Sequence, residues 1–200
     1  GESSLKTNIL LINPNISEYS QNRRINAIIN ISFPTSLGVL AGYLKASGIE
    51  EINIIDEQIH PIDDKDFTHL IGSLEKPRII GISVLTLNCG RAYELAEKIK
   101  NVDKEAVVVF GGIHPTVVPE EVLGKKGVDI VVRGEGEETF KELVQLILEN
   151  KDYRNIPGIS YKKNGEYVHN PDRPLIEDLD VIQAFPYYMF EKDIDKYPNF

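Results

Sequence analysis

The sequence predicts an α/β fold in which a doubly wound, five-stranded parallel sheet is followed by a C-terminal hairpin extension. Short β-branched runs alternate along the chain with amphipathic segments whose apolar residues recur at helical spacing. Strands that alternate with helices form right-handed βαβ units, and these build an open parallel sheet covered on both sides. The pair Asn164-Gly165, typical of a tight hairpin turn, lies between two later strand-like runs.

The first predicted strand covers residues 9–12 and is followed by an unusually long connection. Residues 14–34 show no clean periodicity, although a connection from strand to helix normally has only a few residues. A connection of this length is usually a lid, a binding loop or a disordered segment. The next helix is predicted from the apolar face of residues 37–44.

The middle of the chain repeats this unit with shorter connections. Strands are predicted over residues 52–55 and 79–83, and helices over residues 67–74 and 92–99. The strand runs are rich in isoleucine and lack strict alternation, as expected when strands are mostly buried on both faces.

The last part of the parallel sheet begins with a valine-rich strand at residues 107–110. A short helix is predicted to start at Pro119, a favourable first-turn residue, and to end near Gly124. A strand over residues 129–132 and a helix over residues 140–147 follow. This order of elements predicts a flavodoxin-like or Rossmann-like arrangement.

Beyond residue 150 the pattern changes to a hairpin and an irregular tail. Runs at residues 158–163 and 166–169 flank the predicted turn. Residues 170–200 carry several prolines and tyrosines without a strong helical pattern, so we interpret them as a connecting extension.

Composition argues against several partner classes. The chain has 22 basic and 31 acidic residues and a net charge of −9, which opposes binding to nucleic acid and to anionic lipid. No transmembrane helix or signal peptide is visible in the sequence. Cys89 is the single cysteine, so an intrachain disulfide and a multi-cysteine cluster or zinc site are excluded. We expect a cytoplasmic protein that binds neither nucleic acid nor a membrane.

Ligands of open α/β sheets bind outside the carboxyl ends of the strands, so the residues there are the most informative. Asn13-Pro14-Asn15 follows the first strand, and no glycine lies between Gly1 and Gly38. The glycine-rich turn of a dinucleotide site is therefore missing. A phosphoacceptor aspartate is also missing after the third strand, where Ser83-Val84-Leu85 stands. Nicotinamide or flavin dinucleotides and phosphorelay are disfavoured.

The loop after the fifth strand is also a poor phosphate site. The run 134–138 reads Gly-Glu-Gly-Glu-Glu, which lacks a third glycine and places three carboxylates near a helix start. Those carboxylates suit the helix dipole but repel phosphate. A tight turn followed by a helix start is the preferred interpretation.

Two small motifs remain at the ends of neighbouring strands. Ser83-x-Leu85 ends the third strand, and Gly111-Gly112 ends the fourth. Each alone is typical of a turn or a helix cap. Together they indicate a slot with a hydroxyl on one wall and bare backbone on the other, because paired glycines let a bulky group approach the backbone.

These motifs resemble those of the cobalamin-binding domain family, over roughly three quarters of the chain at the level of element order. The resemblance implies that Ser83 and Leu85 line the pocket of the dimethylbenzimidazole base. It also implies that Gly111 and Gly112 let the nucleotide tail pass. The resemblance and the strand ends predict a set of cofactor-binding residues, with no catalytic or metal-ligating residue: Asn13, Pro14, Ser83, Leu85, Thr86, Gly111, Gly112, His114, Gly134 and Glu135.

A narrower resemblance concerns the runs 111–116 and 133–137, which look like those of cobalamin-dependent radical S-adenosylmethionine proteins. That group includes anaerobic magnesium-protoporphyrin monomethyl ester cyclase and cobalamin-using methylases. It implies a further C-terminal domain that carries a [4Fe-4S] cluster and S-adenosylmethionine. Residues 174–186 resemble the connector to that domain.

The resemblance defines the expected domain organisation. Residues 1–7 are interpreted as a tag remnant or leader, residues 8–150 as the cobalamin-binding-like domain, and residues 151–200 as hairpin and connector. The chain begins without an initiator methionine and stops without a capping signal, so we expect a piece of a longer protein. We expect this piece alone to be non-catalytic, with its own radical domain as partner.

One family motif is absent. The fuller cobalamin motif, Asp-x-His-x-x-Gly after the first strand, supplies a histidine to cobalt, and the sequence lacks it. Asp56 and His60 follow the second strand and do not replace it. We therefore expect cobalamin to bind base-off and without that protein ligand. His114, beside the paired glycines, either donates a hydrogen bond to a ligand or partner domain or caps the turn before Pro115.

Three functions stay open from the residues. The first is the cobalamin-binding module of a radical enzyme that performs methyl transfer or oxidative ring closure. The second is a degenerate domain that keeps the fold without the cofactor and serves in interaction or substrate positioning, which the missing histidine motif favours. The third is a stand-alone nucleotide-binding or sugar-transferring domain, against which the missing phosphate loop argues.

Overall fold

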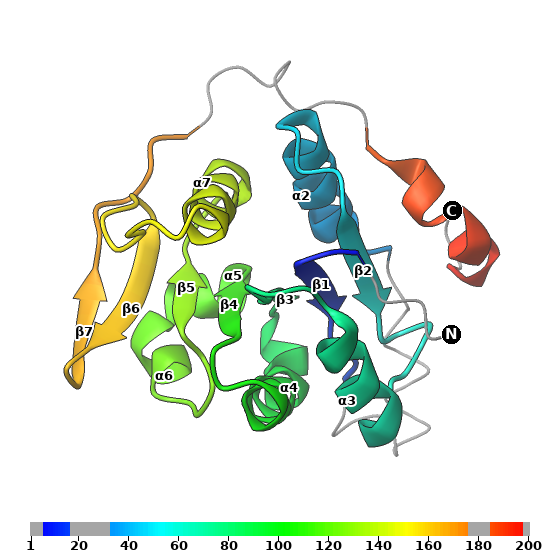
Figure 1. The fold of residues 1–200 in the computed structure, drawn as a ribbon, viewed down its shortest axis with the longest axis horizontal. Helices are drawn as coiled ribbons and strands as arrows, with labels where there is room; N and C mark the ends of the chain where they lie inside the picture. Colours follow the sequence, from blue (N-terminus) through cyan, green and yellow to red (C-terminus); the bar gives the residue numbers. More distant parts are fainter. Residues whose placement is uncertain (1–5, 17–32, 176–184, 198–200) are drawn as a thin grey trace.

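A seven-stranded mixed sheet organises the structure, a computed structural model that describes residues 6–16, 33–175 and 185–197. The strand order is β2-β1-β3-β4-β5-β6-β7 (Figure 1). The five parallel strands are β1 (Ile9–Asn13), β2 (Ile52–Asp56), β3 (Ile79–Ser83), β4 (Val107–Gly111) and β5 (Ile130–Val132). The hairpin strands β6 (Ile159–Lys163) and β7 (Glu166–His169) continue the same sheet antiparallel to β5. The predicted fold class is confirmed.

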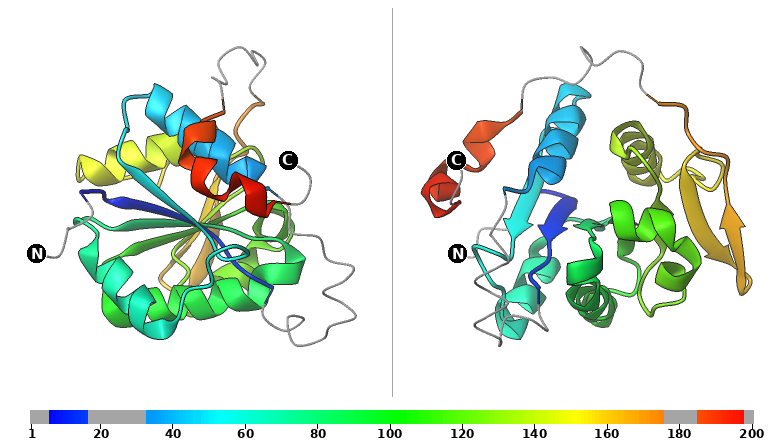
Figure 2. Two further views of the ribbon diagram at one scale, coloured as in Figure 1. Left: turned by 90° about the vertical axis from the view of Figure 1, so that its right-hand side faces the viewer. Right: turned by 180° about the vertical axis from the view of Figure 1, so that it is seen from behind.

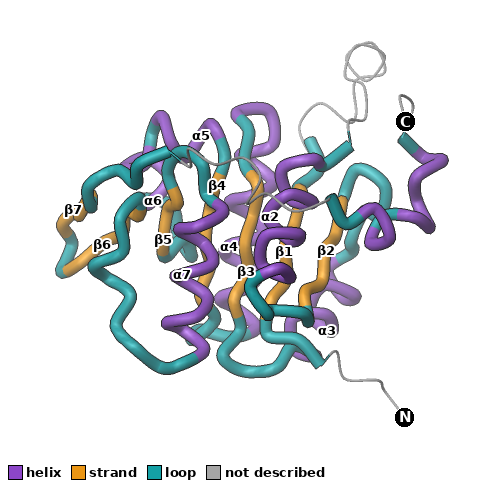
Figure 3. The backbone as a smooth tube through the Cα atoms, turned by 90° about the horizontal axis from the view of Figure 1, so that it is seen from above, coloured by secondary structure: helices purple, strands orange, loops and turns teal. Residues whose placement is uncertain are grey.

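Helices cover both faces of this sheet (Figure 1, Figure 2). One face carries α2 (Thr35–Ala46) and α7 (Glu137–Leu148), and the opposite face carries α3 (Asp64–Ser73), α4 (Cys89–Val102) and α6 (Pro119–Leu123). Seen from above, α2 and α7 lie side by side over the central strands (Figure 3). The order of strands reverses between β1 and β3, so the connections leave from opposite sides of this switch point.

Each face of the sheet has its own hydrophobic core. On the α3 and α4 side the largest fully buried side chains include Phe67 and Phe110. On the α2 and α7 side the buried cluster includes Leu44 and Phe140. Successive strand residues alternate between the two clusters, as the pleat of a strand requires. The isoleucine-rich runs are therefore strands buried from both sides, except for β2, which is half-buried at the edge.

The structure adds short helices that periodicity did not predict. A five-residue helix, α5 (Ile113–Val117), follows β4 immediately. A 3-10 helix, η1 (Thr86–Asn88), precedes α4, and two more, η3 (Tyr187–Met189) and η4 (Glu191–Lys196), lie in the tail. Such helices are too short for a periodic apolar pattern to be recognised.

The tail segment 185–197 packs at the β2 edge, at the opposite end of the sheet from the hairpin (Figure 1, Figure 2). The buried hydroxyl of Tyr197 donates a 2.6 Å hydrogen bond to Asp56 at the end of β2. The Nε2 atom of His60 lies within hydrogen-bond distance, 2.7 Å, of a carboxylate oxygen of Asp193. A Cβ on Gly38 of α2 would lie 2.1 Å from the Phe185 ring, so this glycine provides the space for the tail.

Part of the predicted long connection and of the predicted connector, residues 17–32 and 176–184, lies outside the described residues. Within the described ranges, no helix has the length and apolar character needed to span a bilayer. No group of three or more metal-ligating side chains is arranged for a metal ion in the same part of the chain.

Candidate functional site

A cavity of about 170 Å³ lies between α2 and α7, above the central strands, and we call it the slot. Strands β3, β4 and β5 form its floor, the first two turns of α2 and the first turn of α7 form its walls, and the loop 134–136 lies at its mouth. The residues lining it are Ser36, Leu37, Leu40, Gly81, Ile82, Ser83, Val109, Gly111, Gly112, Val132, Gly134, Glu135, Gly136, Glu137 and Phe140.

Two glycines on neighbouring strands shape the slot in different ways. Gly81 on β3 and its register partner Val109 on β4 form the lower of two adjacent rows in the floor. Ser83 and its register partner Gly111 form the upper row, which is nearer the carboxyl ends of the strands. A Cβ on Gly111 would meet no atom within 4 Å, so this position leaves the upper row open. A Cβ on Gly81 would lie 2.9 Å from Leu11 and 3.2 Å from Phe140, so Gly81 allows those side chains to close the bottom.

Gly112 serves a different purpose from its neighbour. Its φ of +111° lies in a region that side chains rarely adopt, and a Cβ there would lie 2.7 Å from the carbonyl oxygen of Val84. The same Val84 oxygen accepts a 3.3 Å hydrogen bond from the backbone N–H of His114. Gly112 therefore turns the chain sharply from β4 into α5 and holds the loop after β4 against the loop after β3.

The two walls of the slot are connected by a polar contact. The hydroxyl of Tyr43 on α2 donates a hydrogen bond to Glu138 in the first turn of α7. Lys141 holds the same carboxylate at 2.7 Å. Burial and the bond to Glu138 raise the pKa of Tyr43 to about 12. Burial raises the pKa of Glu138, but the bonds from Lys141 and Tyr43 outweigh this and lower it overall.

Ser83 supplies a hydroxyl at the upper row of the slot. Its side chain is half-buried, and its hydroxyl has no hydrogen-bond partner within the described part of the chain. Its backbone carbonyl accepts a 3.4 Å bond from Asn88. The hydroxyl can therefore donate to or accept from a ligand. Leu85, its predicted companion, is 49% exposed and lies outside the slot lining.

Buried Asn88 connects the loops that follow β1 and β3. Its amide nitrogen donates to the carbonyl oxygens of Pro14 at 3.3 Å and Ser83 at 3.4 Å. Its side-chain oxygen accepts a 2.8 Å bond from the N–H of Leu85. One side chain thus satisfies backbone groups of both loops, which holds them at the same edge of the sheet.

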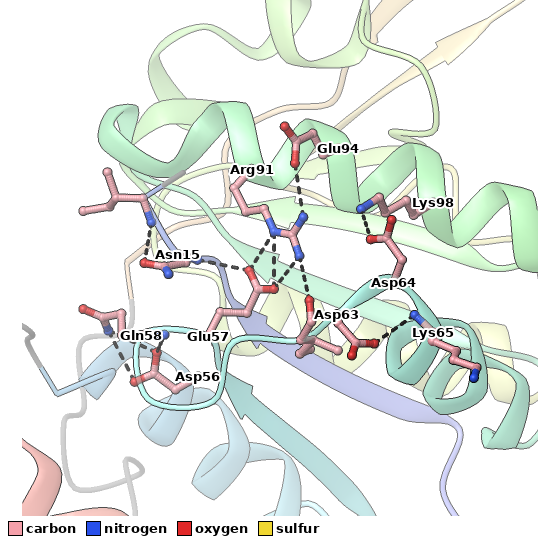
Figure 4. A network of polar contacts seen from close by, with 12 residues as sticks. Asn15, Asp56, Glu57, Gln58, Asp63, Asp64, Lys65, Arg91, Glu94 and Lys98 are labelled. Atoms are coloured by element: carbon pink, nitrogen blue, oxygen red, sulfur yellow. Dashed lines mark hydrogen bonds and ion pairs between the residues drawn. The ribbon is translucent and has the colours of Figure 1, made fainter. Parts of the chain in front are cut away.

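The loop after β1 is also held from the side of β2 (Figure 4). Asn13 donates to Asp56 at 3.0 Å, and the N–H of Asn15 donates to Glu57 at 3.1 Å. Glu57 is 1% exposed and pairs at 2.7 Å with Arg91 on α4. An ion pair this deeply buried needs well-formed hydrogen bonds to offset its desolvation, and Asn15 supplies one of them.

His114 is held on both sides. Its Nδ1 lies 3.3 Å from the hydroxyl of Thr86, and its Nε2 lies 3.1 Å from the hydroxyl of Tyr93. Burial, followed by electrostatic interactions with Cys89 and Glu121, raises the pKa of Tyr93 to about 12. Both ring nitrogens thus have protein partners, and His114 connects the loops after β3 and β4 to α4.

The loop after β5 forms the mouth of the slot. The N–H of Gly134, whose φ is +70°, donates a 3.0 Å bond to the hydroxyl of Thr116 on α5. That hydroxyl in turn donates to the carbonyl oxygen of Gly112 at 2.8 Å. Glu135 is exposed beside it. As predicted, the sequence 134–138 is a turn that leads directly into α7.

The predicted cofactor-binding residues all lie at the carboxyl edge of the sheet, and they divide into two groups. Those lining the slot are Ser83, Gly111, Gly112, Gly134 and Glu135. Those at the same edge but outside the lining are Asn13, Pro14, Leu85, Thr86 and His114.

Sequence reasoning missed several lining residues. Gly81 interrupts an isoleucine-rich strand, and a glycine inside a strand often marks a close approach, so a signal for it existed. Leu37, Leu40 and Phe140 were predicted as parts of apolar helix faces, and periodicity does not distinguish a packed core from the wall of a cavity. Asn88, which lies outside the lining and connects the loops after β1 and β3, carried no signal in the sequence pattern.

A doubly wound sheet with a slot at its carboxyl edge defines a ligand-binding α/β domain. The family model described as the B12 binding domain matches residues 27–144. The chain belongs to the B12 binding domain family.

Relatives point to one larger group of proteins. The chain is 36% identical over 161 residues to an uncharacterized methyltransferase of Pyrococcus horikoshii, covering 80% of this chain and 34% of that protein. It is 34% identical over 154 residues to the anaerobic magnesium-protoporphyrin IX monomethyl ester cyclase of Rubrivivax gelatinosus, covering 74% and 28%. The chain thus spans about a third or less of the length of these relatives.

Solved structures agree with this family. The radical S-adenosylmethionine methyltransferase TsrM from Kitasatospora setae, with tryptophan and an S-adenosylmethionine analogue bound, matches with a TM-score of 0.67 and 26% identity. That match covers 82% of this chain and 30% of the other. The cobalamin-dependent radical enzyme OxsB with aqua-cobalamin bound has the same fold, with a TM-score of 0.68 over 85% of this chain and 23% of its own.

Proposed function

We propose that this chain binds cobalamin with the nucleotide tail in the slot and the corrin ring over the carboxyl edge of the sheet. The observation that carries the proposal is the open space that Gly111 leaves beside Ser83. Below this space, the side chains that pack against Gly81 close the slot. A side chain at Gly111 would fill that space, and the protein has none there.

The size and chemistry of the slot support this proposal. An apolar cavity of about 150 Å³ accommodates a single benzene ring, so a slot of about 170 Å³ has room for the inner six-membered ring of an aromatic base. The Ser83 hydroxyl is available at its upper row for a ring nitrogen. Outside the slot, Leu85, Leu87, Ile113 and Val117 are between 49% and 72% exposed, and they follow β3 and β4. They provide apolar contact area for a macrocycle.

We further propose that cobalamin binds base-off and without a histidine from this chain. The described residues include all four histidines. Both ring nitrogens of His114 have partners, His60 pairs with Asp193, and His169 contacts Ser160 and Glu120. His69 lies on α3, on the face opposite the slot. When bound, cobalamin supplies a cobalt ion that carries a methyl group or exchanges electrons.

The full-length protein is proposed to be a cobalamin-dependent radical S-adenosylmethionine enzyme that performs methyl transfer or oxidative cyclisation. The names of the relatives support both reactions. In this proposal residues 8–150 bind the cofactor, and residues 151–200 lead to a separate domain with the [4Fe-4S] cluster and S-adenosylmethionine. The chain by itself holds and orients the cofactor and does not catalyse the reaction.

Retention of hydroxocobalamin tests the binding proposal. The purified chain is mixed with hydroxocobalamin and desalted, and the visible spectrum of the protein fraction is recorded. We expect retained corrin absorbance for the wild type, and at least a tenfold loss of affinity, about 1.4 kcal/mol, for Gly111→Leu. Leucine at this position fills the slot without meeting any protein atom within 4 Å of its Cβ.

Gly72→Leu is the matched control, because Gly72 on α3 is exposed and its Cβ would also meet nothing within 4 Å. Folding of each variant is checked by circular dichroism. Well-folded wild type that retains no corrin would contradict the proposal and would favour the alternative, a domain of this fold that acts in interaction without a cofactor.

The ligation proposal has its own spectroscopic test. Reduction of the bound cofactor to Co(II) gives an electron paramagnetic resonance spectrum in which a coordinating nitrogen splits each cobalt line. We expect no nitrogen splitting, and no change in the spectrum of His114→Gln. A splitting that His114→Gln removes would overturn this part of the proposal.

A further inference from the structure

We propose that the slot selects among cobamides, the cofactors that share the corrin of cobalamin and differ in their lower base. It favours a base that is apolar at its inner edge, such as a benzimidazole, over one that carries hydrogen-bonding groups there, such as adenine. This inference rests on the proposed function, because it concerns the occupant of the same slot.

The polar groups of the slot lie at its mouth. Ser83 belongs to the upper row, and Ser36, Glu135 and Glu137 come from the start of α2, the loop after β5 and the start of α7. One row deeper, the floor consists of Gly81 and Val109.

The deep part is closed by apolar atoms. The Phe140 ring and a Leu11 methyl group lie within 3.4 Å of the position that a Cβ on Gly81 would take. Leu37 and Leu40 of α2 form the facing wall. No buried polar side-chain atom among the described residues lacks a hydrogen-bond partner. The deep part of the slot therefore offers a ligand no unpaired buried side-chain donor or acceptor from these residues.

The backbone of the floor is also occupied. Strand β3 pairs with β1 on one side and with β4 on the other, and Gly81 is opposite both Leu11 and Val109. Its N–H and C=O groups are therefore engaged in the sheet ladder. A base that enters deeply thus meets carbon atoms and backbone groups that are already paired.

The lower bases differ at the ring that enters first. In dimethylbenzimidazole the ring distal to the ribose carries methyl groups, whereas in adenine it carries ring nitrogens and an amino group. Burying such polar groups without partners carries a desolvation penalty, while burying methyl groups is favourable. We expect cobalamin to bind at least roughly tenfold more tightly than the adenine-bearing cobamide.

The test measures binding of three probes to the purified chain by isothermal titration calorimetry: hydroxocobalamin, the adenine-bearing cobamide and cobinamide, which lacks the nucleotide tail. We expect the order cobalamin, then adeninyl cobamide, with cobinamide weaker than cobalamin. Equal affinity for the two cobamides would overturn the inference. Equal affinity for cobalamin and cobinamide would do so too, because the slot would then contribute nothing.

Variants show whether the slot causes the preference. Val109→Thr places a hydroxyl in the floor at nearly unchanged volume, and Leu40→Gln places an amide in the α2 wall. We expect at least one of them to reduce the ratio of the two affinities severalfold. Val108→Thr is the matched control, because Val108 is buried on the opposite face of the same strand. An unchanged ratio in both folded variants would contradict the inference.

Failure of the inference is distinguishable from failure of the proposed function. If folded wild type bound none of the three corrinoids, the proposed function itself would fail. If it bound cobalamin but did not discriminate against adenine, cobalamin binding would stand and the selectivity would be wrong.

Discussion

Ser83 on β3 is the register partner of Gly111 on β4, so the Ser83 hydroxyl and an open backbone position lie side by side at the carboxyl edge of the sheet. These residues are 28 positions apart in the sequence and belong to two separate short motifs. Their pairing turns two weak local signals into part of the floor of a cavity. The slot between α2 and α7 is the consequence.

Gly112→Ala is expected to destabilise the protein, because alanine must adopt a φ of +111° and its Cβ would approach the carbonyl oxygen of Val84 to 2.7 Å. Such strained conformations cost about 1–3 kcal/mol. Gly111→Ala is the control and should change the melting temperature little, since its Cβ enters open space. Equal shifts in the melting temperatures of both variants would contradict the distinction between these neighbouring glycines.

Glu57→Gln is expected to lower the free energy of unfolding by about 3 kcal/mol, because it removes the buried carboxylate that pairs with the guanidinium of Arg91 and leaves only the exposed Glu94 as its charged partner. Urea titration followed by circular dichroism measures this change. Asp152→Asn removes the carboxylate of an exposed ion pair with Arg154 and should have little effect. A similar loss in both variants would argue against a special contribution of the buried pair.

The Asp103 carboxylate should make stability depend on pH in acid. Burial raises its pKa, but hydrogen bonds from Arg78 and from the N–H of Glu105 outweigh this and hold the pKa below the ordinary value of 3.8. The stabilisation is therefore present above about pH 3.8 and is lost as the pH falls through the lowered folded-state pKa.

Asp103→Asn should consequently lower the free energy of unfolding at pH 7 by roughly 1.5–3 kcal/mol, the value of a hydrogen bond to a charged group. It should also make the decline of stability below pH 3.8 shallower, as measured by urea titrations across this range. Glu166→Gln, which changes an exposed carboxylate at the hairpin turn, should leave the slope unchanged. A parallel slope for Asp103→Asn and wild type would refute this assignment.

Tyr197→Phe is expected to loosen the tail segment 185–197, because it removes the 2.6 Å hydrogen bond to buried Asp56. Burial and that bond raise the pKa of Tyr197, so the phenol is the donor at neutral pH. Hydrogen exchange of the tail amides should accelerate by an order of magnitude or more. Tyr188→Phe, at a side chain that is 60% exposed, should leave this exchange unchanged.

Local sequence patterns were sufficient to predict the strands of the parallel sheet and the long helices that cover it. The isoleucine and valine runs predicted all five parallel strands within a residue or two, and the apolar faces predicted the four long helices. The turn at Asn164-Gly165 and the helix that starts at Pro119 are also confirmed. These features depend on hydrophobic periodicity and on turn chemistry, and both are properties of residues close together in the sequence.

Contacts between distant residues could not be predicted in the same way. The Glu57–Arg91 pair joins positions 34 residues apart, and the Tyr197–Asp56 bond joins positions 141 residues apart. Neither pair forms part of a periodic pattern. Helix α5 was missed because five residues give no repeat, and because Gly111-Gly112 was interpreted as one unit although Gly112 alone requires a positive φ.

The sequence by itself determined the doubly wound fold, the edge of the sheet at which we expect a ligand, and the residue types at that edge. Only the tertiary structure decided that Gly81 and Gly111 face α2 and α7, that Leu85 lies outside the slot, and that both nitrogens of His114 are engaged. The physical reason is that periodicity reports which face of an element is apolar. Whether two such faces meet closely or leave a cavity depends on the shapes of side chains brought together from distant parts of the chain.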